Sequence, residues 1–336
     1  MRFVTLDVFT DTPFRGNPLA IVIVEHSERA ALEQADGPDT KQLIAKEFNL
    51  SETVFLFLRP GETLSAPDRS SAEREIGIFT IDRELPFAGH PTIGTAYFIL
   101  HHLGWDFVTT LLPPAGPIAI TPSSGGHVTA RIPHDVHLHS RTLRSLYELG
   151  DAAVTAQIKP ALHKDEIIRN AELDAPVFSI VKGMTFLLVA LPSLEHLASV
   201  TPTNRLDLNN YVSLLDAGSW GHGFNARYYY VPQGTPTTDS EDATRTEAVR
   251  ARMVELGFED PATGSAASCL AAYRTLYQTE VAHKARYLVT QGVEMGRQSE
   301  IVVDIAVGTT DGGARVLQEL RLGGSAKFVM SGDLYP

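Results

Sequence analysis

The chain has 336 residues, 43% hydrophobic and 20% charged, which is typical of a globular protein long enough for two domains sharing a sizeable core. Lys and Arg total 28 against 40 Asp and Glu, so the formal charge is -12, and this balance argues against nucleic acid as a partner. No apolar run approaches the roughly 20 residues that span a bilayer, and the chain opens on a strand pattern, so we expect a cytoplasmic protein without signal peptide or membrane segment.

The first half of the chain is predicted to be rich in strands. Helical spacing covers 40–48, closed by Asn49, and 92–103. Residues 60–74 are predicted to form an exposed hairpin tip, and the Ser-Gly turn at 123–126 is the expected crossover between domains. Strand patterns occur at 3–9, 19–24, 51–57, 76–82, 108–112 and 118–121.

The second half alternates strands with helices. A polar segment at 233–248 predicts a surface loop that becomes helical over 247–256. Tyr228, Tyr229 and Tyr230 alternate along a strand, so we expect one face in the core and the other facing the active site. The other predicted strands are 128–132, 177–181, 185–191, 226–231, 285–291, 299–305, 319–322 and a last one within 323–332, and the other helices are 141–149, 206–215 and 263–277.

The only cysteine, Cys269, excludes an internal disulfide and a zinc site with several thiolates, in agreement with a reducing compartment. Alanine and leucine residues surround it on a predicted helix. A buried packing role is therefore favoured over a nucleophilic one.

Two segments of the chain share one plan, in which His90 or Asp260 directly precedes a proline, Pro91 or Pro261, and small residues follow. A proline fits the first turn of a helix, where its missing N–H costs nothing. The free N–H groups and positive end of such a helix attract carboxylate or phosphate. The repeat therefore predicts two facing half-sites for an anionic small molecule; the alternative is two ordinary proline-started helices, with Asp260 as a cap.

Residue types suggest the chemistry. Moving a proton to or from carbon needs a carboxylate or imidazole held near the substrate, with a pKa adjusted by partial burial. Glu52, His90 and Asp260 are the candidates.

These motifs resemble the PhzF-like phenazine biosynthesis family, whose fold is that of diaminopimelate epimerase. The matches keep the family's order over nearly the whole length, and the two proline motifs together are highly specific. The matching stretches are Asp7-Val-Phe with Gly16-Asn-Pro, Asn49-Leu-Ser-Glu-Thr-Val-Phe, Glu84-Leu-Pro-Phe-Ala-Gly-His-Pro-Thr, Glu259-Asp-Pro-Ala-Thr-Gly-Ser-Ala-Ala and Gln291-Gly-Val-Glu-Met-Gly-Arg.

The resemblance implies an α+β fold of two similar domains. Each is a curved, mostly antiparallel sheet wrapped around a central helix, and the active site lies in the interdomain cleft. We expect an N-terminal domain of 1–125 plus 323–336, completed by the last strand near Phe328, and a C-terminal domain of 126–322. Homodimers are also implied.

By the same resemblance, Glu52 acts as general base and then acid, moving a proton between carbons of a cyclic dihydro amino acid, while His90 and Asp260 assist. No metal or organic cofactor is implied; the partner is a small anionic substrate. The residues expected to bind it, with the N–H groups around Gly94 and Gly264 receiving a carboxylate, are Asn17, Gly89, Thr92, Gly94, Thr263, Gly264, Ser265 and Gln291.

Other functions stay open at this point. Ala262 stands where epimerases of this fold carry a catalytic cysteine, which argues against a two-thiol racemase. A racemase or epimerase using Glu52 with a second non-thiol base, and a non-catalytic metabolite-binding protein, are the alternatives to a PhzF-like isomerase. Extra residues at 60–74 and 233–248 imply a different substrate choice.

His134, His137 and His139 have a spacing that suits zinc or nickel. Apart from Asp135, no carboxylate or cysteine framework accompanies them. We therefore expect an exposed loop without a metal ion.

Overall fold

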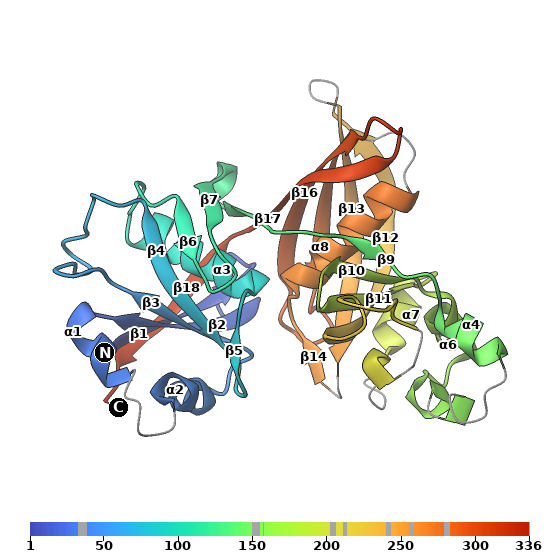
Figure 1. Ribbon diagram of the computed structural model, residues 1–336, viewed down its shortest axis with the longest axis horizontal. Helices are drawn as coiled ribbons and strands as arrows, with labels where there is room; N and C mark the ends of the chain where they lie inside the picture. Colours follow the sequence, from blue (N-terminus) through green and yellow to red (C-terminus); the bar gives the residue numbers. More distant parts are fainter. Residues whose placement is uncertain are drawn as a thin grey trace. The chain divides into compact units, whose positions relative to one another are not determined.

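The computed structural model describes residues 1–32, 39–149, 155–156, 158–201, 206–210, 214–239, 243–255, 258–278 and 283–335 (Figure 1). These form two compact units: unit 1 is Met1–Ile132 with Arg321–Pro336, and unit 2 is Pro133–Leu320. The expected boundary near 125 differs from this division, because the turn at 123–126 joins two antiparallel strands within unit 1. No helix among the described residues is both long and apolar enough to cross a membrane.

The sheet of unit 1 is mostly antiparallel. Among the described residues, its strands pair in the order β18–β1–β2–β3–β4–β6–β7–β8–β17. In this order β2–β3 and β4–β6 are the parallel pairs. The expected return of the C-terminal strand is confirmed, since β18 pairs with β1. The bounds are β1 Arg2–Val8, β2 Asn17–Val24, β3 Thr53–Phe57, β4 Glu73–Phe79, β5 Glu84–Leu85, β6 Thr110–Leu112, β7 Ile118–Pro122, β8 Val128–Arg131, β17 Arg315–Gly324 and β18 Ala326–Asp333.

One central helix lies inside the curve of this sheet. α3 (Gly89–Tyr97) is buried except at its last residue and continues as a π-helical segment, Phe98–His102. It contacts β18 and β1 as well as β8, strands from both ends of the pairing order, so the sheet curves around it. On the outer face, α1 (His26–Leu32) and α2 (Thr40–Phe48) cover β2, β3 and β4 with a separate apolar cluster.

Unit 2 repeats the plan. Its strands pair in the order β9–β10–β11–β12–β13–β15–β16, with β14 also on β13, and α8 (Gly264–Tyr273) contacts β10, β11 and β16. The π-helical segment Arg274–Gln278 again extends the helix. The bounds are β9 His137–Leu138, β10 Val177–Val181, β11 Met184–Ala190, β12 Phe224–Thr238, β13 Thr244–Glu255, β14 Phe258–Asp260, β15 Lys284–Gln291 and β16 Ser299–Thr309.

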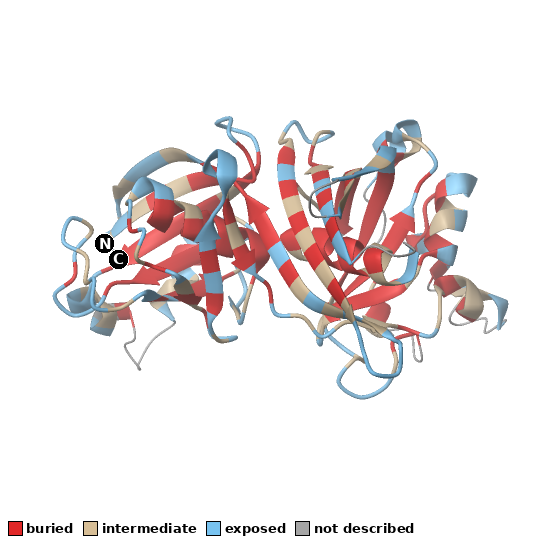
Figure 2. Ribbon diagram, turned by 90° about the horizontal axis from the view of Figure 1, so that it is seen from above, coloured by how far each residue is buried: buried red, intermediate tan, exposed pale blue. Residues whose placement is uncertain are grey.

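The two ends of this second sheet, β10 to β13 and β15 to β16, differ in what covers their outer face. α4 (Leu143–Glu148), α6 (Glu166–Asp174) and α7 (Leu194–Ser199) pack on β10 to β13, so β11 and the first half of β12 are buried on both faces. Along β15 and β16, buried residues alternate with more exposed ones (Figure 2). That alternation indicates one face on the core and one toward water.

Several local expectations are wrong. Residues 247–255 belong to strand β13, in which buried and half-buried residues alternate over 247–251. β13 pairs with β12, so the expected loop is a hairpin. Residues 240–242 and 256–257 lie outside the described residues. Only Leu208–Asn210 of the expected helix 206–215 is helical, as a 3-10 turn, and 211–213 are not described. Within 60–74, Glu62 and Arg74 form a fully buried ion pair 2.5 Å apart, so this segment is not simply an exposed tip.

Candidate active site

Glu52 and His90, which we call the first half-site, come together in unit 1 from two separate elements. Helix α2 ends at Asn49, whose left-handed backbone (φ 51°) reverses the chain, and Glu52 then lies directly before β3. His90 is the second residue of α3. Its Nδ1 lies 3.4 Å from Oε2 of Glu52, and the two side chains are 5% and 18% exposed, respectively.

The environment of Glu52 changes its acidity. Burial raises the pKa of Glu52 from 4.5 to about 7, because a low-dielectric surrounding disfavours the charged carboxylate, and a hydrogen bond from the Ser51 side chain partly opposes this rise. Near neutral pH both forms of the carboxyl group are therefore populated. Such a group can accept a proton and return it without a large free-energy cost for either step.

The start of α3 follows the prediction in part. Pro91 lies in the first helical turn, as expected, while the N–H and hydroxyl of Thr92 both donate to the carbonyl of Ala88, at 3.3 and 2.7 Å. Gly94 is the sixth residue of the helix, so its N–H belongs to the intrahelical hydrogen bonds and cannot receive a carboxylate. A Cβ there would lie 2.5 Å from a methyl of Leu19, and close packing therefore accounts for this glycine.

The remaining predicted binding residues of unit 1 are Asn17 and Gly89. Both are buried, Asn17 at the start of β2 and Gly89 at the start of α3. The residue before Asn17 is a glycine with φ +69°, where an added Cβ would lie 2.3 Å from the carbonyl oxygen of Val8. The Gly-Asn-Pro stretch therefore fixes the chain reversal that brings β2 beside β1.

Asp260 stands at the end of β14 in unit 2, where two kinds of contact hold it. Its strand pairs with β13, with Asp260 opposite Met253. The neighbouring Glu259 accepts two hydrogen bonds from Arg252, both 2.7 Å long, and the same guanidinium reaches the carbonyl of Val200 after α7. Two elements thus brace the backbone beside Asp260.

Four side chains form what we call the second half-site: Asp260, Thr263, Gln291 and Tyr228. Thr263 donates from its hydroxyl to Oδ2 of Asp260 at 2.6 Å. Gln291 donates from Nε2 to Oγ1 of Thr263 at 3.0 Å and to the carbonyl of Asp260 at 2.8 Å. Its Oε1 accepts from the N–H of Thr263 at 3.2 Å and from the hydroxyl of Tyr228 at 3.0 Å. Gln291 is fully buried, and its side-chain amide holds the backbone from Asp260 to Thr263 through these hydrogen bonds.

The start of α8 requires two corrections. Thr263 is the N-cap residue and Pro261 lies before it, so this proline precedes the helix instead of entering its first turn. Asp260 is likewise not the N-cap residue, because it lies three residues earlier. Gly264 and the half-buried Ser265 are the first two helical residues, and their N–H groups are among those without an intrahelical partner. Gly292 (φ +74°) passes so close to Pro261 that a Cβ would lie 2.6 Å from its carbonyl oxygen.

Cys269 packs inside unit 2 as predicted. It is fully buried in α8, its thiol contacts the carbonyl of Phe178 at 3.2 Å, and burial raises the pKa of the thiol. A neutral, enclosed thiol is a poor nucleophile.

His137 and His139 meet Asp216, and their ligand atoms lie within 4.8 Å of one another, whereas His134 contacts the carbonyl of Leu317. The N–H of Asp216 donates to Nδ1 of His139 at 2.9 Å, so Nε2 carries the ring proton and donates to Ser179 at 2.9 Å. Burial lowers the pKa of His139 to about 4, which keeps the ring neutral. Both ring nitrogens are thus committed to protein groups, an arrangement that favours a structural network over a metal site. His139 is buried, so the expected exposed loop is wrong at this residue.

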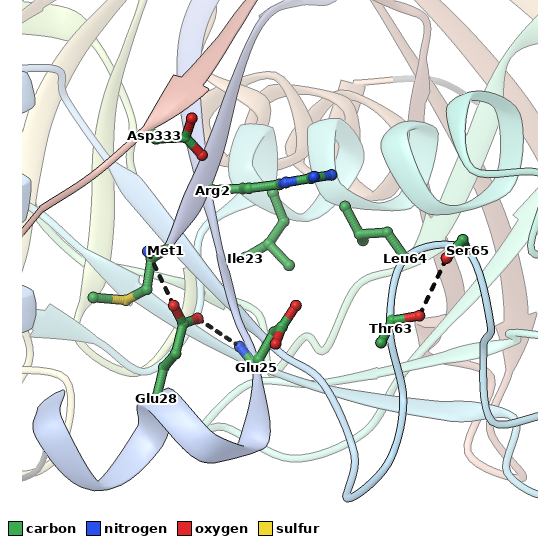
Figure 3. Close-up of a pocket in the computed structure, with 9 residues that line it drawn as sticks. All are labelled: Met1, Arg2, Ile23, Glu25, Glu28, Thr63, Leu64, Ser65 and Asp333. Atoms are coloured by element: carbon green, nitrogen blue, oxygen red, sulfur yellow. Dashed lines mark hydrogen bonds and ion pairs between the residues drawn. The ribbon is translucent and has the colours of Figure 1, made fainter.

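Unit 1 also has an open pocket of about 410 Å³ (Figure 3). Its lining includes Arg2, Ile23 and Leu64 together with the carboxylates of Glu25 and Glu28. No member of the first half-site lines it. Its charges are mixed, and Glu28 is already paired with the amino group of the first residue at 3.0 Å. We therefore do not place the candidate active site in this pocket.

Sequence reasoning missed one member of the second half-site, Tyr228. All three tyrosines of its strand are buried: Tyr229 lies in the outer core and bonds to Glu172, while Tyr228, on the other face, bonds to Gln291. The alternation in the sequence separated the two faces, but nothing in it indicated that Tyr228 reaches Gln291.

The family model described as phenazine biosynthesis-like protein matches residues 6–332. An uncharacterised isomerase of Mesorhizobium japonicum is 30% identical over 99% of this chain and 98% of its own length. The trans-2,3-dihydro-3-hydroxyanthranilate isomerase of Pseudomonas aeruginosa is 28% identical over 89% of this chain and 88% of its own. The crystal structure of a PhzF-family protein of Bacillus anthracis has the same fold, with a TM-score of 0.67 and 17% identity over 100% of this chain and 99% of that one.

Proposed function

Because the chain belongs to the phenazine biosynthesis-like protein family and is an isomerase, we propose that it moves a proton between carbon atoms of a small carboxylated, amino-bearing substrate by general acid–base catalysis. Glu52 is the group that carries the proton in this proposal. His90, 3.4 Å away, assists it.

The observation that carries the proposal is the state of Glu52. Its pKa is raised to about 7 by burial, its side chain is still 18% exposed, and an imidazole lies beside it. A solvated glutamate would be too weak a base to remove a proton from carbon at neutral pH and too strong an acid to hold one. A carboxyl group near pKa 7 serves both directions.

The proton balance closes within one carboxyl group. Ionised Glu52 takes a proton from a carbon next to an unsaturated or carbonyl group, and the electron pair of the broken C–H bond moves into the conjugated system. The protonated Glu52 then gives its proton to a different carbon of that system. The base is regenerated, nothing is oxidised or reduced, and the proposal therefore includes no cofactor.

The proposal assigns Asp260, with Gly264 and Ser265 at the start of α8, to the same reaction. The positive end of that helix suits the substrate's carboxylate. The Pseudomonas aeruginosa relative is named for an amino acid with a partly reduced ring, which supports an amino-bearing carboxylic acid as the substrate class here.

Deuterium incorporation tests the proposal. We would incubate the enzyme in D2O with a set of small amino and carboxylic acids that includes trans-2,3-dihydro-3-hydroxyanthranilate, and follow carbon-bound deuterium by mass spectrometry. Glu52→Gln should lower the labelling rate by about 10²- to 10⁴-fold. The matched control is Glu47→Gln, which makes the same change at an exposed glutamate of α2.

The position of the label separates the alternatives. Deuterium at a new carbon, with a shifted double bond, supports the isomerase. Label at the original carbon with inverted configuration would replace it by a racemase or epimerase that uses two non-thiol bases. A compound that binds wild type and Glu52→Gln equally, without labelling by either, would instead indicate a metabolite-binding protein.

A further inference from the structure

Each hydrogen bond of the second half-site can be assigned a donor and an acceptor. The N–H of Thr263 can only donate, so the Gln291 atom that receives it must be the amide oxygen, Oε1. Nε2 then faces Oγ1 of Thr263 and donates to it at 3.0 Å. The hydroxyl proton of Thr263 is thereby directed to Oδ2 of Asp260, 2.6 Å away.

Tyr228 stands at the far end of this series. Its hydroxyl donates to the same Oε1 at 3.0 Å, so both lone pairs of the amide oxygen are occupied. Burial and the negative charge of Asp260 raise the pKa of Tyr228, so the hydroxyl keeps its proton at physiological pH. Tyr228 is itself held between β11 and β13, opposite Leu188 and Met253, in a part of the sheet that is buried on both faces.

We propose that Tyr228 is a positioning residue, which fixes the amide of Gln291 and, through Thr263, orients the carboxylate of Asp260 as a hydrogen-bond acceptor. The value of this orientation for catalysis rests on the proposed role of Asp260. Without the tyrosine hydroxyl, Oε1 of Gln291 loses one of its two donors among the described residues and keeps the N–H of Thr263, so the amide can tilt away from Oγ1. The hydroxyl of Thr263 is then no longer directed to Asp260 alone.

The chain offers a matched control for Tyr228→Phe. Tyr229 is the next residue of β12, is equally buried, and donates its hydroxyl to Glu172 on the opposite face of the sheet. Tyr229→Phe therefore removes one buried hydroxyl and one hydrogen bond from the same strand without touching Gln291. A general loss of stability would affect both variants, whereas the positioning role predicts a difference between them.

The first readout needs no substrate. In the wild type both side-chain amide protons of Gln291 are hydrogen-bonded, so their exchange with solvent, measured by ¹⁵N NMR and assigned with Gln291→Glu, should be slow. Tyr228→Phe should speed it by about tenfold or more, as expected when a buried hydrogen bond of ordinary strength is lost, and Tyr229→Phe should leave it unchanged. Equal exchange in the wild type and Tyr228→Phe would overturn the inference.

The second readout is the deuterium-transfer rate. Tyr228→Phe should lower kcat about three- to tenfold with little change in KM, and Tyr229→Phe should match the wild type. Gln291→Glu should lower kcat further, because a carboxylate accepts the hydroxyl proton of Thr263 and turns it away from Asp260. Equal kcat losses in the two tyrosine variants would contradict a positioning role. If the wild type transfers no deuterium at all, the proposed function fails, and amide exchange still decides the role of Tyr228.

Discussion

Glu52→Gln should stabilise the protein while it removes activity, and the gain should grow with pH. The folded-state pKa of Glu52 is about 7 against 4.5 for an ordinary glutamate. Between these values the folded state binds more protons than the unfolded chain, so stability falls as pH rises through this window. Glutamine is never ionised and escapes this loss.

The magnitude follows from the same two values. At about 1.4 kcal/mol per pH unit, the rise from 4.5 to about 7 corresponds to about 3 kcal/mol of unfolding free energy at pH 8. At pH 5 only about 1 kcal/mol remains. These figures are upper bounds, because water reaches 18% of the side chain.

The assay is thermal unfolding at pH 5 and at pH 8. For a unit of this size, about 3 kcal/mol raises the melting temperature by roughly 6 to 12 °C, so Glu52→Gln should show a clearly larger gain at pH 8. Glu47→Gln, at an exposed position of α2, should show no pH-dependent gain. A gain of equal size at both pH values would refute the argument from burial.

Three further predictions concern activity and packing. The pH profile of kcat/KM for deuterium transfer should rise to an inflection near pH 7 as Glu52 ionises; a flat profile from pH 5 to 9 would exclude Glu52 as the base. Arg74→Met should lower the free energy of unfolding, measured in urea, by about 3 to 5 kcal/mol, because it leaves Glu62 buried without its cation. The double variant with Glu62→Gln should regain much of this stability. A double variant no more stable than Arg74→Met would contradict the reasoning. In the same urea assay, Gly94→Ala should lower the free energy of unfolding by about 1 to 3 kcal/mol, because the added methyl group overpacks α3 on β1 and β2. Gly312→Ala, at an open position, should lower it by less than about 0.5 kcal/mol. Equal losses of stability in the two variants would argue against close packing at Gly94.

Local patterns in the sequence predicted an element correctly where the residues of that element alone decide its structure. Helix α2 runs over Thr40–Phe48, as its spacing predicts, and ends at a left-handed Asn49. Strand β10 also has its predicted bounds, Val177–Val181. The family followed from short motifs in the right order, because a proline or glycine at a turn has a fixed conformational meaning whatever surrounds it.

Tertiary structure decided what depends on partners distant in the chain. The segment 247–255 became a strand because β12 pairs with it on one side and β15 and β14 pair with it on the other, which outweighs its helical tendency. The same holds for the sites: burial by the folded chain, not the residue type, brings the pKa of Glu52 to about 7, and the fold joins Tyr228 of β12 to Gln291 of β15 across the intervening strand β13. The sequence indicates candidate acid–base residues, but their desolvation and the direction of their hydrogen bonds exist only after the sheets have closed around α3 and α8.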